Sequence, residues 1–421
     1  MAVNIKNKSV LIYDFGLFIE IARTLAKSFG KVYYFCPWQS AFPSTNIYSV
    51  GIGVEDIIKV DSFWDYVDEV DLIAFFDVYC GDMQVYLESQ GKRVFGGRRG
   101  EEMELDRVAM KEMMKEKGLL VNDYEVIIGM DNLKKYLKGV KDKYVKISRF
   151  RASFETFRHD NYNLSEPKLE EIEHLMGAYK NICEFIVEDA LDDCVEIGLD
   201  CYTADGKFPS KTLCGCEIKD IGYYGNVKDY NDIPKEITDF DKKMASTLKS
   251  YGYRGFYSTE MRVTRKHESY MIDACERAAS PPSELYGLMY RNLAEIIWEC
   301  SGGNIIDPVT EHKYGMEVLI HSEWADKNWQ SVEFDPKFRE NIKFRNLAVI
   351  GGKYYCAPQY VGLPEIGAIV AEGDTPEEAI EKIKEIAETV KGYFIDVKLD
   401  SIDQALAEAK KVEEFGIKLF D

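Results

Sequence analysis

Two short segments near the middle of the chain each carry an acidic residue at a matching position. Residues 256–263 and 270–277 both have the alternation of a strand, and a turn centred midway between them sets Glu260 directly opposite Asp273 in an antiparallel hairpin. Opposed carboxylates repel each other unless a cation lies between them, and oxygen ligands suit Mg²⁺. The hairpin therefore predicts a divalent metal site, although acidic residues on such a strand more often form a solvated face.

The second strand of this hairpin brings two further functional groups beside the acids. Side chains alternate between the two faces of a strand, so Cys275 and Arg277 share the face of Asp273. A metal ion with an adjacent guanidinium can neutralise the charge that develops during phosphoryl transfer. These residues therefore favour a phosphate-transferring enzyme.

The composition bounds the class of protein. The chain has 421 residues, 46% of them hydrophobic, which suits two to four globular subdomains with their own cores. The net charge is −20, from 53 basic and 73 acidic residues. This balance argues against a nucleic-acid partner and against an anionic membrane surface, since both attract clustered Lys and Arg.

The cysteines and the N-terminus indicate the compartment. Ten cysteines are scattered without metal-ligand spacing, and the nearest pair, Cys214 and Cys216, is not a CxxC motif. The first residues lack the apolar run of a signal peptide, and no stretch approaches 18 apolar residues. We therefore expect reduced thiols and a cytoplasmic location.

The N-terminal hundred residues alternate strand and helix signals. Short apolar runs separated by helical periodicity indicate a parallel α/β sheet, with strands expected at 9–13, 32–36, 72–76 and 94–96. No GxGxxG follows the first run, so a dinucleotide-binding fingerprint is absent.

The rest of the chain predicts a mixed arrangement of helices and strands. The periodicities favour helices at 105–117, 130–137 and near 169–180, and strands at 144–147, 195–202, 317–321 and 347–350. Two capping boxes, at Thr375 and at Ser401, predict the last two helices. The predicted fold class is α/β and α+β.

The order of these pieces resembles that of the ATP-grasp ligases, and the three-part layout is most similar to the glycinamide ribonucleotide synthetase branch. Lys111 and Lys146 are similar to the two lysines that this family places on the phosphates of ATP. The segment Glu188, Asp189, Ala190 and Leu191 resembles the hinge whose backbone pairs with adenine, and Glu196 resembles the acceptor of the ribose hydroxyls.

The hairpin also matches the family's metal and substrate positions. The resemblance implies that Glu260 and Asp273 bind Mg²⁺, with Mn²⁺ as the alternative ion, and that Arg277 steadies the substrate carboxylate and then its phosphate. Cys275 stands where the family has a metal-binding asparagine, and thiols bind Mg²⁺ poorly. Arg262 and Lys219 are added to Arg277 as candidate catalytic residues.

Two departures from the family pattern bear on the substrate. The loop 148–153, where the family has a glycine-rich phosphate loop, contains no glycine, and Arg151 is expected to supply its charge instead. The glycinamide ribonucleotide synthetase substrate segments have no counterpart. The resemblance therefore implies a relative with another acceptor.

The resemblance implies an ATP-grasp fold in four parts, with boundaries placed from the sequence. These are an N-terminal parallel α/β domain (1–104), a lid (105–190), a metal and catalytic subdomain (191–308) and a small C-terminal α+β domain (309–421). The implied reaction joins a small-molecule carboxylate to an amine through an acyl phosphate, with ATP and Mg²⁺. Two alternative functions stay open: an ATP-binding protein with degenerate catalysis, and a peptide ligase acting on a protein or peptide. Formation of a homodimer is also left open.

Overall fold

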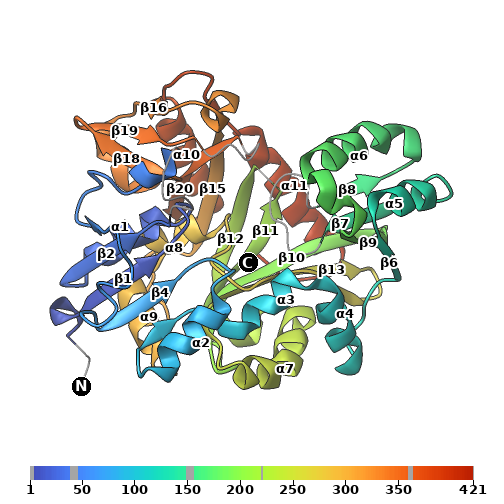
Figure 1. The fold of residues 1–421 in the computed structure, drawn as a ribbon, viewed down its shortest axis with the longest axis horizontal. Coiled ribbons are helices and arrows are strands. Elements are labelled where there is room, and N and C mark those ends of the chain that lie inside the picture. The colour runs from blue at the N-terminus through green and yellow to red at the C-terminus, as the bar shows by residue number, and fades with distance from the viewer. Residues whose placement is uncertain (1–3, 38–45, 148–155, 220, 359–363, 421) are drawn as a thin grey trace.

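The structure is a computed structural model that describes residues 4–37, 46–147, 156–219, 221–358 and 364–420. Figure 1 shows three lobes, with the N-terminal sheet on the left, a small helical and stranded lobe on the upper right, and a long sheet between them. The fold class is a mixture of a parallel sheet and antiparallel sheets, as predicted.

The N-terminal sheet is parallel, and its strands lie in the order β3-β2-β1-β4-β5. Every predicted strand of this region is present. The bounds are β1 (Ser9–Tyr13), β2 (Lys31–Phe35), β3 (Ile58–Lys59), β4 (Leu72–Phe75) and β5 (Val94–Phe95), with the helices α1 (Ile19–Ala26) and α2 (Gly81–Ser89).

The lobe on the upper right of Figure 1 is a four-stranded antiparallel sheet with its own hydrophobic core. We call it the lid. Its elements are β6 (Tyr124–Ile128), α5 (Met130–Leu137), β7 (Lys143–Ile147), β8 (Thr156–His159), α6 (Tyr162–Met176) and β9 (Glu184–Asp189). Two helices lead into it, α3 (Glu102–Leu105) and α4 (Arg107–Glu116), and the Asp106 side chain caps α4 by accepting from the Ala109 amide at 3.0 Å.

The central sheet has nine strands, in the order β14-β13-β10-β11-β12-β15-β20-β17, with β21 paired to β15. Its strands are β10 (Cys194–Ala204), β11 (Lys211–Ile218), β12 (Gly222–Asp229), β13 (Arg254–Thr264), β14 (Ser269–Cys275), β15 (Tyr314–His321), β17 (Ile342–Phe344), β20 (Glu365–Gly373) and β21 (Asp396–Val397). Because β15 pairs with β12, residues on both sides of the predicted boundary at 309 share this sheet. The domain boundaries therefore stay a prediction.

The remaining elements cover this sheet or extend it. They are α7 (Lys235–Ser250), α8 (Ser283–Met289), α9 (Leu293–Ser301), a three-stranded sheet of β16 (Gln330–Val332), β18 (Leu347–Ile350) and β19 (Lys353–Cys356), α10 (Pro376–Ala387) and α11 (Asp400–Glu414). Thr375 caps α10 as predicted. The predicted cap at Ser401 is wrong, because Leu399 is the N-cap of α11 and Ser401 is buried inside that helix.

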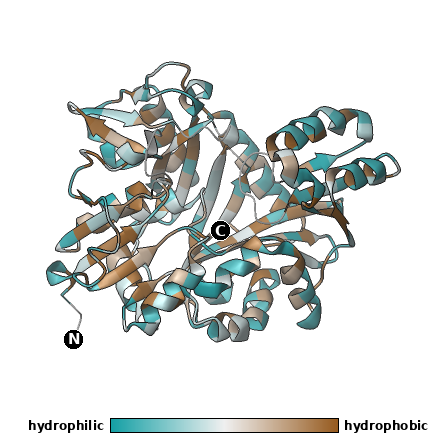
Figure 2. Ribbon diagram, in the orientation of Figure 1, coloured by the Kyte–Doolittle hydropathy of each residue, from teal (hydrophilic) through white to brown (hydrophobic). Residues whose placement is uncertain are grey.

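One hydrophobic core joins one face of the parallel sheet to the central sheet and to α10 and α11. Figure 2 shows hydrophobic colour on the strands at the left and in the middle, while the outer helices alternate between hydrophobic and hydrophilic residues. Among the described residues, no helix combines the length and the apolar character that a membrane crossing requires.

Candidate nucleotide and metal site

The predicted hairpin is formed by β13 and β14, and Glu260 is the register partner of Asp273. The pairing shifts by one residue between Glu260 and Met261, so Ile272 is an extra residue in β14. Beyond this bulge the partially exposed residues of β14 lie on the face of Asp273, which includes Cys275. The predicted opposition of the two acids is therefore confirmed, while their binding of metal stays a prediction.

The bulge links the hairpin to the lid. Lys146, on β7 of the lid, donates to the backbone carbonyl of Ile272 at 2.6 Å. A residue that a bulge leaves out of the ladder has a carbonyl available for such a contact. The hairpin and the lid therefore meet at the residue that breaks the strand pairing.

A cavity, which we call the basic cavity, lies at this junction. Its lining contains three basic side chains, two acidic ones and four methionines: Met103, Arg107, Met110, Lys111, Met114, Lys146, Glu188, Met271, Ile272, Asp273 and Ala274. Flexible, polarisable methionines adapt to flat apolar groups, and cations attract phosphates. The lining therefore suits a ligand that carries an apolar ring and negative charge.

Glu188 is the counter-charge of both predicted phosphate lysines. Its carboxylate lies 3.0 Å from Lys111 Nζ and 3.6 Å from Lys146 Nζ, and Asn122 donates to it at 3.1 Å. Burial would raise the pKa of Glu188, but Lys146 and Lys111 outweigh burial and lower it. Burial in turn lowers the pKa of Lys111. The two predicted lysines therefore converge on one point of the basic cavity.

Arg107 is a residue of the basic cavity that the sequence interpretation missed. Its guanidinium lies 3.2 Å from Asp273 Oδ2 and donates to the Ile147 carbonyl at 2.7 Å, which ties α4 to the hairpin and to the lid. It was detectable, because Arg107 precedes Lys111 by four residues, and residues four apart share a helix face.

The predicted hinge follows the end of β9. The amide of Asp189 donates to the Asp123 carbonyl at 2.9 Å, and the amide of Ala190 donates to the Asp142 carbonyl at 3.2 Å. The Asp189 side chain pairs with Lys143, and the Leu191 carbonyl accepts from Cys194 Sγ at 3.2 Å. Two of the hinge amides are therefore used within the protein.

A second cavity, which we call the acidic depression, lies on the face of the central sheet beside Glu260. Its lining contains four carboxyl groups and neither Lys nor Arg: Glu196, Ile197, Gly198, Asp200, Gly215, Glu217, Tyr223, Ser258, Thr259, Glu260 and Ala279. Burial first, and then the charges of Glu196 and Asp273, raise the pKa of Glu260 to about 8. The hairpin acids therefore form a boundary, with Asp273 in the basic cavity and Glu260 in the acidic depression.

Glu196 is paired across the sheet with Arg262. The Nε and Nη2 groups of Arg262 both donate to Glu196 Oε2 at 3.3 Å, and the guanidinium lies 5.5 Å from the centre of the Tyr144 ring in the lid. The structure therefore places Glu196 beside Glu260 in the acidic depression. Its predicted contact with ribose stays a prediction.

The remaining predicted site residues, Arg277, Cys275, Lys219 and Arg151, do not line either cavity or lie outside the described residues. Arg277 donates to Glu104 at 3.0 Å and is not among the lining residues of either cavity, and Cys275 lies between it and Asp273. Lys219 follows β11 directly, and its charge lowers the pKa of Glu260. Arg151 lies outside the described residues.

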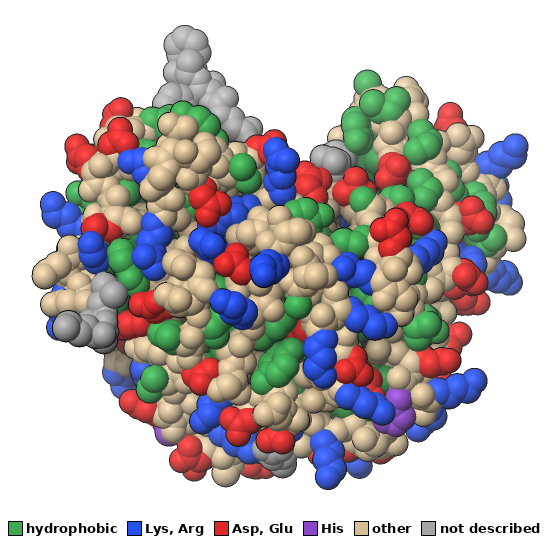
Figure 3. All heavy atoms as spheres, turned by 90° about the horizontal axis from the view of Figure 1, so that it is seen from below, with side chains coloured by type: hydrophobic (Ala, Val, Ile, Leu, Met, Phe, Trp, Pro, Cys, Tyr) green, Lys and Arg blue, Asp and Glu red, His purple; other side chains and the backbone are tan. Residues whose placement is uncertain are grey.

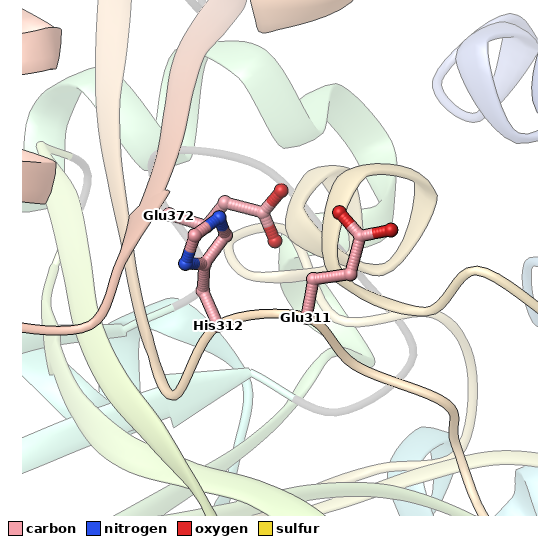
Figure 4. Close-up of side chains that lie close together, drawn as sticks. All are labelled: Glu311, His312 and Glu372. Atoms are coloured by element: carbon pink, nitrogen blue, oxygen red, sulfur yellow. The ribbon is translucent and has the colours of Figure 1, made fainter.

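Elsewhere, one further group of side chains has metal-like geometry. Glu311, His312 and Glu372 each offer a ligand atom within 4.8 Å of the others, and Figure 4 shows the two carboxylates and the imidazole gathered around one space. However, Arg291 pairs with both carboxylates, and His312 Nδ1 lies 3.0 Å from Asp374. This group is therefore an ion-pair cluster. Among the described residues, no other three His, Cys, Asp or Glu side chains lie this close together. Glu260 and Asp273 are therefore two candidate ligands without a third of these types at that distance.

Comparison with known proteins identifies the fold to which this site belongs. No family model matches the sequence, and no curated protein matches it at a significant level. Solved structures match over nearly the whole chain. Phosphoribosylamine–glycine ligase from Thermotoga maritima has a TM-score of 0.69 at 16% identity, with 92% of this chain and 98% of that chain covered.

Two further neighbours were solved with nucleotides. The biotin carboxylase domain of Hydrogenobacter thermophilus 2-oxoglutarate carboxylase, in complex with MgADP, ADP and bicarbonate, has a TM-score of 0.66 at 13% identity and covers 97% of this chain and 98% of its own. N5-carboxyaminoimidazole synthetase from Staphylococcus aureus, complexed with ADP, has a TM-score of 0.60 at 12% identity and covers 90% and 96%. These neighbours are ATP-grasp ligases, and the chain has the ATP-grasp fold.

Proposed function

We propose that this protein is an ATP-dependent ligase that joins a carboxylate to an amine through an acyl phosphate. The observation that carries the proposal is the meeting of three basic side chains, Arg107, Lys111 and Lys146, with the opposed acids Glu260 and Asp273 at the junction of lid and central sheet. The neighbours include phosphoribosylamine–glycine ligase and a biotin carboxylase domain solved with MgADP, which supports the same class of reaction here.

Lys111 and Lys146 would bind the phosphates of ATP. In the structure both approach Glu188, so phosphate oxygens would take over part of the charge that Glu188 now neutralises. The methionines of the basic cavity would pack against adenine. The hinge amides of Asp189 and Ala190 donate within the protein, so we assign the pairing with the adenine edge to Leu191.

Glu260 and Asp273 fit a divalent ion by the chemistry of their donors. Carboxylate oxygens are the ligands that Mg²⁺ prefers, and two carboxylates leave room for phosphate oxygens and water. Burial first, and then the charges of Glu196 and Asp273, raise the pKa of Glu260, so a cation bound between the two opposed acids would favour their ionised forms. Bound Mg²⁺ would supply the charge that the transferred phosphate requires.

The chain's own groups would then act on the substrate carboxylate. A carboxylate oxygen attacks the γ-phosphorus, the bond from phosphorus to the β,γ-bridging oxygen breaks, and ADP leaves with that electron pair. Lys219, Arg262 and Arg277 are the candidates to orient this carboxylate: the charge of Lys219 acts on Glu260, while Arg262 lies on Glu196 and Arg277 on Glu104. The amine nitrogen then attacks the acyl carbon, the bond from carbon to the phosphate oxygen breaks, and the phosphate takes the proton.

A nucleotide-binding protein without turnover is the second candidate. The observations that favour it are the ion pair between Arg107 and Asp273 at 3.2 Å and the thiol of Cys275 at the family's asparagine position. It predicts ATP binding with no ADP release for any pair of substrates.

The experiment that tests the proposed function measures ADP release with ATP, Mg²⁺ and panels of carboxylates crossed with amines. Asp273→Asn is expected to lower turnover by about 100-fold or more, because one anionic metal ligand is lost. Lys146→Met is expected to weaken ATP binding in calorimetry, while Lys143→Met, on the same strand but paired with Asp189, leaves it unchanged. Unchanged ATP affinity in Lys146→Met would contradict the nucleotide assignment.

A further inference from the structure

A row of glycines crosses the central sheet in register with the hairpin acids. Glu260 pairs with Gly198 on β10, Gly198 with Gly215 on β11, Gly215 with Gly225 on β12, and Gly225 with Gly315 on β15. Side chains in one such row lie on one face of the sheet. On this face of the sheet, the four positions next to Glu260 in the row therefore carry no side chain.

The glycines are not equally covered. A Cβ atom added to Gly215 would lie 2.6 Å from the Tyr223 hydroxyl, and one added to Gly225 would lie 2.6 Å from the Tyr223 ring. A Cβ atom on Gly198 would meet nothing closer than 3.4 Å, and the nearest side-chain atom would be Asp200 Oδ2 at 3.9 Å. The Tyr223 ring thus occupies one end of the row, and the acidic depression opens over Gly198.

Tyr223 and Asp200 form the far wall of the acidic depression. The Tyr223 hydroxyl donates to Asp200 Oδ2 at 2.6 Å, so the glycines let this ring lie across the sheet and reach a carboxylate on the next strand but one. The Ser258 side chain, which is 3% exposed, also lines the depression, and its Oγ has no hydrogen-bond partner of ordinary geometry although it lowers the pKa of Asp200. A buried hydroxyl without a partner of ordinary geometry is a position that a polar ligand or an ordered water can fill.

The wall of the depression opposite Tyr223 is formed by acidic side chains. Glu196 and Glu217 lie on adjacent strands, two positions along from Gly198 and Gly215, and line the depression together with Glu260. Glu260 belongs to the proposed metal pair, and the charges of Lys219 and Lys146 act on it. The other three carboxyl groups, those of Glu196, Asp200 and Glu217, have two cations near them among the described residues, Arg262 on Glu196 and Lys219. In this part of the depression the carboxyl groups therefore outnumber the described cations by one.

We propose that the acidic depression binds the amine substrate, and that this substrate is a diamine or a related compound with a second cationic group. The inference rests on the proposed function, because the depression gains this meaning from its position beside Glu260. The surplus of carboxyl groups over cations, and the buried Ser258 hydroxyl without a hydrogen bond of ordinary geometry, match an alkylammonium group, which presents three donors.

The second cationic group follows from the chemistry of amide formation. The attacking nitrogen must be unprotonated, so it cannot itself satisfy the carboxylates. One nitrogen of a diamine attacks the acyl carbon, the bond to the phosphate oxygen breaks, and the phosphate leaves with one proton of that nitrogen. The other nitrogen keeps its proton throughout and stays with Glu196, Glu217 and Asp200, which fixes the reacting end near Glu260.

The test measures binding of 1,4-diaminobutane to the full chain by calorimetry, without nucleotide, with 1-butanol and 1-butylamine as comparison ligands. We expect the diamine to bind most tightly and Glu217→Gln, which replaces a carboxyl group that the ammonium would ionise with an amide of the same shape, to weaken it about tenfold or more. Gly198→Val, which fills the depression, should weaken it as well. Glu311→Gln, which removes a carboxylate in the ion-pair cluster around Arg291, should leave it unchanged. Matching unfolding midpoints would show that the variants fold.

Three results would overturn the proposal: no diamine binding at millimolar concentration, equal affinity in Glu217→Gln and wild type, or binding of Mn²⁺ that depends on Glu217 and that the diamine does not displace. The last result would make the depression a second metal site. Failure of the proposed function appears in a different measurement, as absence of ATP binding that depends on Lys146. Diamine binding without nucleotide is scored independently of it.

Discussion

The basic cavity and the acidic depression adjoin the same hairpin, and the charges of their linings are opposite. The basic cavity has Arg107, Lys111 and Lys146 against two acids, whereas the acidic depression has four carboxyl groups and no basic side chain. Asp273 belongs to the first and Glu260 to the second. The comparison shows a division of charge that would keep phosphates on one side of the metal pair and an ammonium group on the other.

The two regions also differ in how they neutralise buried charge. In the basic cavity, Glu188 pairs with both lysines, so the charges are compensated within the protein. In the acidic depression, burial and the charge of Glu260 raise the pKa of Glu217 well above its usual range. A bound proton therefore removes part of the negative charge there. The outer surface shows no such separation, since Figure 3 shows Lys and Arg interspersed with Asp and Glu on the face seen from below.

The largest expected effect tests the compensation in the basic cavity. Glu188→Gln would leave Lys111 and Lys146 buried without their counter-charge, and breaking a buried pair in this way costs about 3–5 kcal/mol. We expect the free energy of unfolding in urea to fall by roughly this amount, and ATP to restore more of it in the variant than in the wild type, because phosphates replace the lost carboxylate. A variant as stable as the wild type would show that the lysines do not depend on Glu188.

The basic cavity was largely predictable from the sequence, and the acidic depression was not. Glu260 and Asp273 belong to one hairpin, so their proximity was predictable, but the pairs nearer the turn are centred on Lys266 and not between Lys266 and His267. The extra residue Ile272 then brings Asp273 opposite Glu260. Lys111 and Lys146 lie in elements with clear local periodicity. The family resemblance then supplied their order.

The acidic depression depends on pairings between distant segments. Asp200, Glu217 and Tyr223 come from β10, β11 and β12, and β10 lies between β11 and β13, which is about 60 residues further along the chain. Period-2 alternation shows that a residue is in a strand but not which strand lies beside it. The strands β11 and β12 were missed altogether, because runs buried on both faces lack the alternation that marks a half-exposed strand.

A smaller effect tests the electrostatics of the acidic depression through pH. Burial raises the pKa of Asp200 to about 6 from a usual value of 3.8, against the opposing hydrogen bond from Tyr223. The folded state therefore holds a proton that the unfolded state has lost between about pH 4 and pH 6, so this group makes unfolding easier as the pH rises through that window. Its contribution is at most about 3 kcal/mol, at 1.36 kcal/mol for each pKa unit.

Urea titrations from pH 4 to pH 7 would measure this contribution. We expect Asp200→Asn to flatten the decline across the window, since the amide does not titrate. Asp239→Asn, which changes an exposed aspartate on α7, should leave the slope as in the wild type. An identical slope in Asp200→Asn would contradict the raised pKa and show that the folded protein does not hold a proton on this carboxyl across the window.

The smallest expected effect compares two glycines of the same row. Gly198 and Gly215 are register partners on adjacent strands, so both substitutions to Ala face the same sheet surface. Ala at Gly215 would place Cβ 2.3 Å from the Tyr224 carbonyl and 2.6 Å from the Tyr223 hydroxyl, and such overpacking costs about 1–3 kcal/mol. Ala at Gly198 meets only contacts of 3.4 Å or more, so Gly198→Ala is expected to change the free energy of unfolding by less than about 1 kcal/mol. The change is expected to be stabilising, because Ala lowers the conformational entropy of the unfolded chain.

Urea unfolding of the two variants measures the difference directly. Equal losses at both positions would mean that side chains already fill the space over Gly198, and the acidic depression would then be too shallow for a ligand.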